Sequence, residues 1–154
     1  MNLVVRTYRP EDRPAALALA TRLEIGVAPW RDPAAVQAAV AGWVRGSLDL
    51  AEAGERTVLV AVRDDALVGF VTVSRRAHFT GDVDGYVGEL AVAAGEERRG
   101  VGRDLMRAAE QWAHDQGYRR LTLETGAANH SARAFYAALG YAEEDVRLTR
   151  RLPG

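Results

Sequence analysis

Apolar residues recur along the chain with two different periods, and the period indicates which segments form helices and which form strands. The most regular helical pattern is expected over Gly100–Gln116. Its apolar residues recur three or four positions apart, at Val101, Leu105, Ala109, Trp112 and Ala113. Glycine and tyrosine follow at 117–118 and are typical of a helix C-terminus. A shorter helix is expected to begin at Ser131.

Two more helices are expected in the first third of the chain. Pro10 and the acidic residues after it favour a helix start, and this helix should run to about Glu24. A break rich in glycine and proline follows over residues 26–33. Asp32 precedes a proline and is a natural N-cap, so a second helix should extend from there to about Glu52.

Runs rich in β-branched residues predict strands between these helices. Strands are expected at Leu3–Tyr8, Thr57–Arg63, Leu67–Ser74, Tyr86–Ala93 and Leu121–Glu124, with closing strands within Ala142–Leu152. The second and third of these are joined by Asp64-Asp65-Ala66, which predicts a hairpin. Helices alternating with strands indicate an α/β domain.

Composition excludes several classes of function. At 154 residues, the chain suits a single domain over 1–154. Its net charge of −1 disfavours nucleic acid as a partner. The absence of cysteine excludes thiolate metal sites and an acyl-cysteine intermediate. The chain has no membrane-length apolar run and no apolar leader, so we expect no membrane partner and a cytoplasmic location.

The stretch Glu89–Met106 combines a strand, a glycine-containing loop and the start of a helix. Such a junction directs unpaired backbone N–H groups and the positive end of a helix at one point, so it suits an anion such as a pyrophosphate. A dinucleotide fingerprint is disfavoured because its third glycine position holds Leu105. A P-loop is disfavoured because the chain contains no lysine.

This stretch resembles the acyl-CoA-binding motif of the GCN5-related N-acetyltransferase (GNAT) family. Gly100 and Gly102 fit its two small positions, whereas Glu97 stands where the family usually has Gln or Arg. A second motif follows one helix and one strand later. It comprises Asn129, the pair Phe135-Tyr136 and the sequence Leu139-Gly140-Tyr141. The resemblance is strong over residues 86–141.

The resemblance implies the GNAT fold, a mixed central sheet of about six to seven strands flanked by four helices. The strands at 86–93 and 121–124 would be parallel neighbours that splay apart. It also implies acetyl-CoA as co-substrate and no metal. The pantetheine arm would bond to the backbone of Leu90, Ala91 and Val92, with help from Asn129. The pyrophosphate would meet Arg98, Arg99, Gly100, Val101, Gly102 and Arg103.

The same resemblance names two catalytic candidates. Tyr136 would donate a proton or hydrogen bond to the departing CoA sulfur; alternatively, it is a core aromatic residue. Glu89 would deprotonate the amine through water; alternatively, it only attracts a cationic substrate. Asn129 could instead cap the last helix. Trp30 is a candidate substrate wall or a core lid, and His78 is a candidate base or an ordinary surface histidine.

The implied activity is transfer of acetyl from acetyl-CoA to a primary amine, with a small-molecule amine favoured, in a direct ternary complex. Two alternatives stay open. The acceptor could be a protein N-terminus or lysine, or the domain could bind acyl-CoA as a sensor without turnover. A homodimer is a further possibility because dimers are frequent among relatives. The segments that would line the acceptor site resemble the family least, so the acceptor is not identified at this stage.

Overall fold

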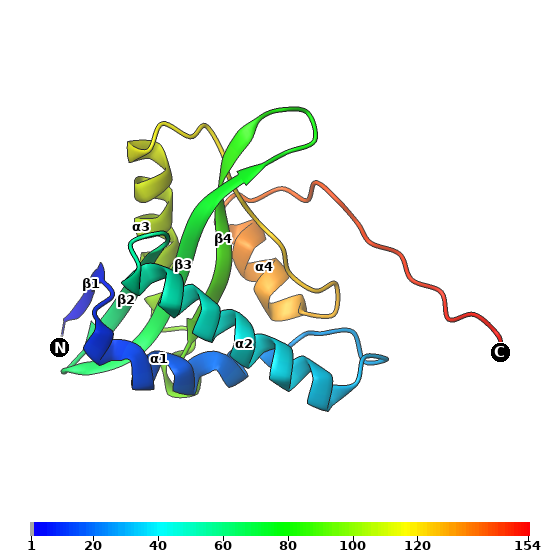
Figure 1. Ribbon diagram of the computed structural model, residues 1–154, viewed down its shortest axis with the longest axis horizontal. Coiled ribbons are helices and arrows are strands. Elements are labelled where there is room, and N and C mark those ends of the chain that lie inside the picture. The colour runs from blue at the N-terminus through cyan, green and yellow to red at the C-terminus, as the bar shows by residue number, and fades with distance from the viewer. Residues whose placement is uncertain (1) are drawn as a thin grey trace.

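The computed structural model describes residues 2–154, which form a five-stranded sheet between two helical layers (Figure 1). In chain order the elements are β1 (Leu3–Thr7), η1 (Pro10–Asp12), α1 (Arg13–Ala18), η2 (Leu19–Glu24), α2 (Pro33–Glu52), β2 (Thr57–Arg63), β3 (Ala66–Ala77), β4 (Val83–Val92), η3 (Ala94–Glu96), α3 (Val101–Asp115), β5 (Leu121–Leu123) and α4 (His130–Ala138). The predicted α/β class is confirmed.

The sheet follows the order β1-β2-β3-β4-β5, with antiparallel pairing up to β4 and parallel pairing between β4 and β5. The predicted hairpin at 64–66 is present. Asp64 and Asp65 form its two-residue loop with φ of 51° and 64°. Positive φ at both loop residues matches the twist of the flanking strands, and aspartate tolerates that conformation better than most residues.

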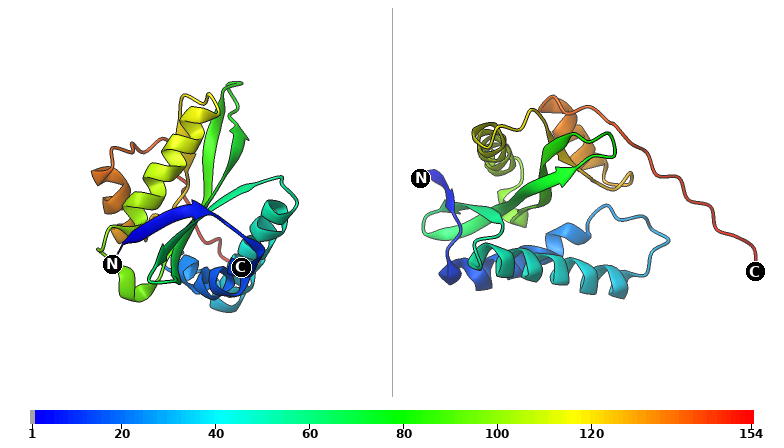
Figure 2. Two further views of the ribbon diagram at one scale, coloured as in Figure 1. Left: turned by 90° about the vertical axis from the view of Figure 1, so that its left-hand side faces the viewer. Right: turned by 45° about the horizontal axis from the view of Figure 1, so that its top comes forward.

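Helices cover both faces of the sheet (Figure 2). On one face, Val44 and Leu48 of α2 pack with Phe70 of β3. On the other face, Leu105 and Met106 of α3 pack against valines of β3 and β4, and α4 adds half-buried aromatic residues there. We call these the α2 face and the α3 face. Each strand alternates its side chains between them, which is why the strands are apolar in nearly every position.

A β-bulge in β4 changes which face its side chains occupy. Thr72 pairs with Glu89, but the next residue of β3, Val73, pairs with Val87, so Gly88 is an extra residue in β4. Residues two apart in a strand normally share a face. Here Val87 packs on the α3 face, whereas the side chain of Glu89 bonds to α2. The extra residue therefore turns Glu89 towards α2.

The parallel pairing of β4 with β5 is short. It covers only Gly85–Val87 of β4 against Leu121–Leu123 of β5. From Gly88 to Val92, β4 continues without β5 beside it. The two strands therefore splay where β4 approaches the loop before α3, as the sequence analysis expected. The splayed edge leaves backbone groups of β4 available to a ligand.

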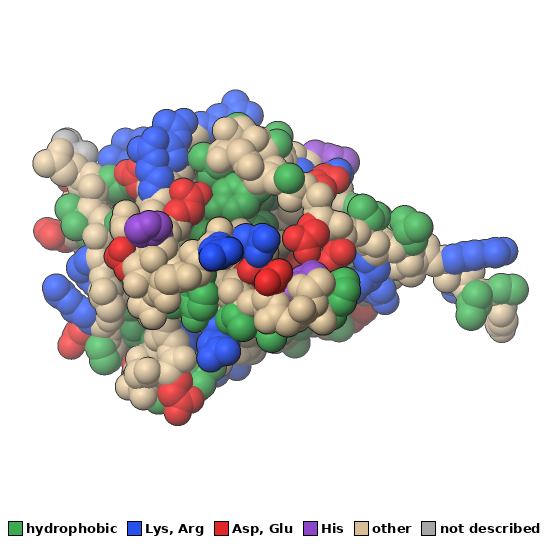
Figure 3. All heavy atoms as spheres, turned by 90° about the horizontal axis from the view of Figure 1, so that it is seen from above, with side chains coloured by type: hydrophobic (Ala, Val, Ile, Leu, Met, Phe, Trp, Pro, Cys, Tyr) green, Lys and Arg blue, Asp and Glu red, His purple; other side chains and the backbone are tan. Residues whose placement is uncertain are grey.

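The expected closing strands over Ala142–Leu152 are wrong, and the sheet has five strands instead of six or seven. The C-terminal end of the chain projects beyond the body of the molecule (Figure 3). Val146, Leu148 and Leu152 are exposed along this tail. Their alternating pattern favours an extended backbone, but a strand also needs a neighbouring backbone to bond with.

The first expected helix is also different. Instead of one helix to Glu24, the chain forms η1, α1 and η2 in succession. Pro14 lacks an N–H and is tolerated only in the first turn of an α-helix, so the α-helical part begins at Arg13. Within residues 2–154, none of the helices combines the length and apolar character needed to cross a bilayer.

Candidate active site

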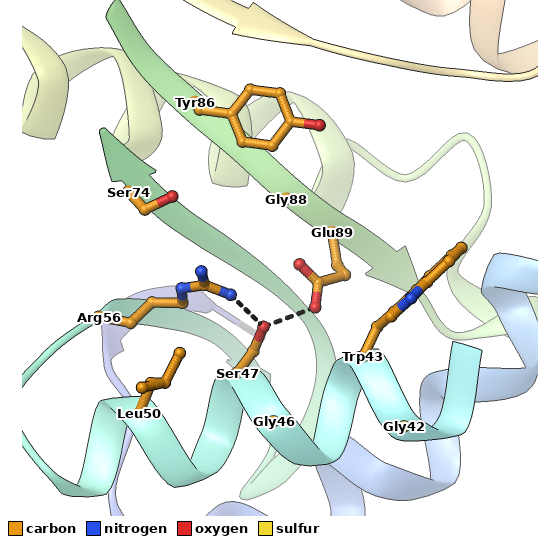
Figure 4. Close-up of a pocket in the computed structure, with 10 residues that line it drawn as sticks. All are labelled: Gly42, Trp43, Gly46, Ser47, Leu50, Arg56, Ser74, Tyr86, Gly88 and Glu89. Carbon is orange, nitrogen blue, oxygen red and sulfur yellow. Dashed lines mark hydrogen bonds between the residues drawn. The ribbon is translucent and has the colours of Figure 1, made fainter. Parts of the chain in front are cut away.

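A pocket of about 390 Å³ lies between α2 and the strands β3 and β4 (Figure 4). It is lined by Gly42, Trp43, Gly46, Ser47, Leu50, Arg56, Ser74, Tyr86, Gly88 and Glu89. Gly42 and Gly46 are one helical turn apart on α2, and the absence of side chains there leaves room above the sheet. The volume suits a small ligand.

Glu89 forms the floor of this pocket and is only 7% exposed. Ser47 Oγ donates to its Oε1 at 2.6 Å, and Thr72 Oγ1 donates to its Oε2 at 2.5 Å. The backbone N–H of Glu89 donates to the same threonine oxygen at 2.9 Å. Figure 4 shows the carboxyl group pointing from β4 towards α2. Two hydroxyl groups therefore hold one acidic side chain at a fixed place.

Arg56 lies beyond Ser47 in the same hydrogen-bonded chain. Its Nη1 donates to Ser47 Oγ at 2.8 Å, and this hydroxyl in turn donates to Glu89 (Figure 4). The pocket thus contains one acidic and one basic side chain, connected through a serine. Trp43 stands at its mouth and is 61% exposed. The ring of Tyr86 is held by the Arg76 guanidinium, 4.4 Å from the ring centre.

The loop between β4 and α3 has the form expected of an anion site. Arg98 and Gly100 have φ of 62° and 86°, and Gly100 is the N-cap of α3 without a side-chain cap. The first N–H groups of α3 have no partner within the helix, because intrahelical bonding begins one turn later. Arg98, Arg99 and Arg103 are exposed around this end. The arrangement can bind a phosphate group.

Gly102 has a packing role as well. A Cβ atom at this position would lie 3.2 Å from the Phe135 ring of α4, which is tighter than most real contacts. The glycine therefore lets α4 approach the first turn of α3. Because of this contact, a bulky residue at 102 would disturb α4 as well as any bound phosphate.

Glu97, the residue that departs from the family motif, has a partner far away in sequence. It forms an ion pair with Arg22 of η2. The same guanidinium donates through Nε to the carbonyl oxygen of Val92 at 2.9 Å. Arg22 therefore ties η2 to the end of β4 and to the start of the loop. Val92 is one of the three residues whose backbone is expected to bind pantetheine, and its carbonyl oxygen already accepts this hydrogen bond.

Tyr136 lies on α4 among aromatic rings on the α3 face. It packs edge-on against Phe135 and Tyr141, with ring centres 5.1 and 5.8 Å away. Burial raises the pKa of Tyr136 to about 12. Within residues 2–154, its hydroxyl has no hydrogen-bond partner. It is thus a protonated phenol with a free donor.

Asn129 acts as the N-cap of α4. Its side-chain oxygen accepts from the Ala132 N–H at 3.1 Å, and its amide nitrogen donates to the Ile25 carbonyl at 3.3 Å. Both the oxygen and the nitrogen of the side-chain amide therefore have partners within the fold. Capping of the last helix is the alternative role given for this residue. Its proposed contact with the cofactor arm stays a prediction.

Trp30 and His78 do not line the pocket around Glu89. Trp30 lies in the loop between η2 and α2 and is 65% exposed. His78 lines a separate hollow of about 320 Å³, where its Nε2 is 3.2 Å from a Glu144 carboxylate oxygen. Their expected roles at the acceptor site remain predictions, because neither residue lies beside Glu89 in this pocket.

The sequence pattern did not indicate four residues that line the pocket, Trp43, Ser47, Arg56 and Tyr86, or Thr72, which bonds to Glu89. Most stand in segments that look like ordinary helix or strand. One local signal was available for α2: the small residues Gly42, Gly46 and Ser47 lie on one side of the helix. A row of small residues on one side of a long helix indicates that another segment packs closely there or that a pocket opens there.

Comparison with known proteins agrees with this arrangement. The acetyltransferase (GNAT) family model matches residues 18–141. No curated protein matches the chain significantly. Among solved structures, PaiA N-acetyltransferase from Thermoplasma acidophilum, in complex with coenzyme A, is 17% identical with a TM-score of 0.80; the match covers 96% of this chain and 94% of that one.

Two further structures share the fold. An acetyltransferase of Trypanosoma brucei is 18% identical with a TM-score of 0.69, covering 98% of this chain and 100% of that one. An aminoglycoside N-acetyltransferase in complex with CoA is 20% identical with a TM-score of 0.72, covering 97% and 95%. At these identities the structures show the fold, and the family model covers most of the chain. The protein therefore belongs to the acetyltransferase (GNAT) family of acetyl-CoA-dependent N-acetyltransferases.

Proposed function

We propose that this protein transfers the acetyl group of acetyl-CoA to the primary amine of a small molecule in a direct ternary complex. The observation that carries the proposal is the free edge of β4. One end of this edge leads to the phosphate-binding start of α3, and the other carries Glu89 at the floor of a pocket. Two CoA-bound structures of the same fold support the choice of co-substrate.

The chain offers a place for each part of acetyl-CoA. The N-terminus of α3 and the arginines around it would hold the pyrophosphate. The exposed backbone of β4 around Leu90 and Ala91 would bond the amide-bearing pantetheine arm as a short extra strand. That path leads the thioester along β4 towards Glu89. The two positive-φ residues before α3 shape the phosphate cradle.

Glu89 and Tyr136 would then serve opposite halves of the reaction. A primary amine with a pKa near 10 is neutral in only about one molecule in a thousand at pH 7, so it must lose a proton before it attacks. Glu89 accepts this proton, through water. The amine nitrogen bonds to the thioester carbonyl carbon, its second proton passes to solvent, and the carbon–sulfur bond breaks. The phenol of Tyr136 donates a proton to the departing sulfur and is reprotonated by solvent.

The size of the pocket favours a small acceptor over a protein. About 390 Å³ between a helix and a sheet accommodates a metabolite-sized amine. One structure of similar fold is named as an aminoglycoside N-acetyltransferase, so the acceptor in its name is also a small molecule. A protein acceptor would need an extended groove able to hold several residues of a peptide.

A screen of amines with release of free CoA as readout tests the proposal, with Glu89→Gln as the diagnostic variant. Glutamine keeps the size of the side chain, and the hydroxyl groups of Ser47 and Thr72 can rotate to suit it. If Glu89 is the base, the variant should lose most turnover at neutral pH and recover part of it as pH approaches the pKa of the amine. If Glu89 only attracts substrate, KM should rise with little change in kcat.

The remaining outcomes discriminate against the proposal. Tight CoA binding without CoA release from any amine would indicate an acyl-CoA sensor. Turnover with peptides but with no small amine would indicate a protein acetyltransferase. Kinetics of Glu89→Gln equal to those of the unmodified protein would remove Glu89 from the mechanism and leave an ordered water or His78 as the base.

A further inference from the structure

Arg56 is a half-buried pocket residue whose charge no acidic side chain neutralises directly. It stands between α2 and β2 and lines the pocket beside Ser74. In the described part of the chain, its one hydrogen bond goes to the hydroxyl of Ser47. Within residues 2–154, no carboxylate forms an ion pair with it. A guanidinium has five N–H donors, so most of those on Arg56 are free to bind a ligand.

The other half-buried arginines within residues 2–154 each have an acidic partner. Arg6 pairs with Asp12 at 2.8 Å, and Arg13 pairs with Glu52 at 2.6 Å. Removing a guanidinium from water without an anionic partner is costly, so half-buried arginines are normally paired. The free donors of Arg56 face the pocket in Figure 4. An anionic group of a ligand would complete this site.

Glu89 supplies the complementary half. Ser47 accepts from Arg56 at 2.8 Å and donates to Glu89 at 2.6 Å, so only one hydroxyl group separates the two charged side chains. A ligand that satisfies both must carry a cationic amine and an anion only a few bonds apart. A planar carboxylate matches the fork of a guanidinium with two parallel hydrogen bonds.

The charge of the pocket also argues against polycations. Its lining contains one acidic and one basic side chain, so it is neutral overall. A polyamine or an aminoglycoside would bring an ammonium group close to Arg56, and like charges repel at such distances. At the opposite end, the exposed Trp43 offers an aromatic surface to an apolar group.

We propose that the acceptor is a small zwitterion of amino-acid type. Its amine faces Glu89, its carboxylate binds the guanidinium of Arg56, and its apolar side group lies against Trp43. This inference rests on the proposed function and names the substrate class for the same site. Arg56 is then a specificity-determining residue, because it binds the substrate without taking part in the proton transfers.

Matched pairs of acceptors test the inference. Leucine, phenylalanine and tryptophan are each compared with the amine left when the carboxylate is removed, with spermidine and an aminoglycoside as polycations. The readout is CoA release as a function of acceptor concentration. We expect kcat/KM to be about tenfold or more higher for at least one amino acid than for its decarboxylated partner, because the site would leave Arg56 unpaired with the latter.

The variant Arg56→Gln identifies the residue responsible. It should raise KM for the amino acid about tenfold or more while changing kcat/KM of the decarboxylated amine little, so the preference disappears. Arg56→Lys keeps the charge without the fork and should give an intermediate preference. The matched control is Arg45→Gln, which removes an exposed arginine of α2 outside the pocket and should leave the preference intact. Thermal unfolding confirms that each variant is folded.

Failure of the inference can be told from failure of the proposed function. Decarboxylated amines or polycations could be acetylated as efficiently as amino acids, with this turnover lost in Glu89→Gln. That result would support the proposed acetyltransferase function and overturn the inference that the acceptor is a zwitterion. The same holds if the preference for amino acids survives in Arg56→Gln. Absence of CoA release with every acceptor would overturn both proposals.

Discussion

The surroundings of the Tyr136 phenol set the protonation state that its proposed role requires. Its aromatic neighbours exclude water, and this burial raises its pKa from 10.0 to about 12. A phenol can donate a proton only while it is protonated. The sequence pointed to this residue through the family motif, but its protonation state depends on rings contributed by α4 and the segment after it.

Replacement of Tyr136 by phenylalanine should lower turnover by roughly ten- to a thousandfold and leave CoA affinity unchanged. The ring and its edge contacts persist, whereas the donor to the leaving sulfur is lost. Turnover measured by CoA release and affinity measured by calorimetry give the two quantities. Tyr118→Phe is the control, because Tyr118 packs against Trp112 near the C-terminal end of α3.

The pH dependence follows from the same pKa. Because the phenol stays protonated below about pH 12, turnover of the unmodified protein should not decline on its account between pH 8 and 10. A phenol with the ordinary pKa near 10 would be half ionised at the end of that range. A decline centred near pH 10 that is absent from Tyr136→Phe would contradict the role of burial.

At the scale of elements, the bulge in β4 places the acidic side chain. If Gly88 were paired regularly in β4, Glu89 would share the α3 face with Val87 and could not reach Ser47 of α2. The bulge also requires a small residue. A Cβ atom at position 88 would lie 2.9 Å from Thr72 Oγ1, the atom that holds Glu89 through two hydrogen bonds.

Gly88→Ala should therefore lower turnover about tenfold or more without weakening CoA binding. The added methyl group pushes Thr72 aside, and a displaced Glu89 no longer meets the amine in the required geometry. Gly95→Ala is the matched control, since a Cβ atom there has no heavy atom within 4 Å. Equal turnover of the two variants would show that Thr72 and the bulge do not position Glu89.

The whole molecule combines a well-packed body with a tail that contributes little to it. Residues 146–154 are exposed throughout, whereas Glu143 and Glu144 just before them pair with Arg133 and His78. The edge of β5 opposite β4 has no strand beside it within residues 2–154. The tail and this edge are thus both unpaired in the single chain.

Deletion of residues 146–154 should change the thermal unfolding midpoint by less than about 2 °C, because exposed segments contribute little to the free energy of unfolding. Light scattering on both proteins reports the oligomeric state. A decrease of more than about 5 °C, or a change from dimer to monomer, would show that the tail packs against a second copy in solution. A change from dimer to monomer would also show that the unmodified protein is the expected homodimer.

Local patterns predicted most elements of the fold. Caps such as Asp32, the two-residue hairpin loop and the helical spacing after Gly100 act over a few residues, so they are visible without tertiary contacts. The two motifs predicted a glycine-containing loop at a helix start and Tyr136 on the last helix, and both elements are present; the binding and catalytic roles stay predictions. The closing strands were wrong because strand propensity is local, whereas pairing is not.

The pocket itself could not be derived in this way. Ser47 and Thr72 precede Glu89 by 42 and 17 residues, and only folding brings their hydroxyl groups to its carboxylate. Whether Arg56 has an acidic partner likewise depends on where the fold places the acidic side chains.

The sequence by itself determined the α/β class, most of the order of helices and strands, the glycine-containing loop before α3 and the family. These follow from periodicity and short motifs, whose physical basis lies within a few residues. Only the tertiary structure decided which face Glu89 occupies, which hydroxyl groups hold it and what charge shares its pocket. The reason is that one extra residue in β4 reverses the direction of a side chain, and the position of that residue is set by the register between strands rather than by the chain around it.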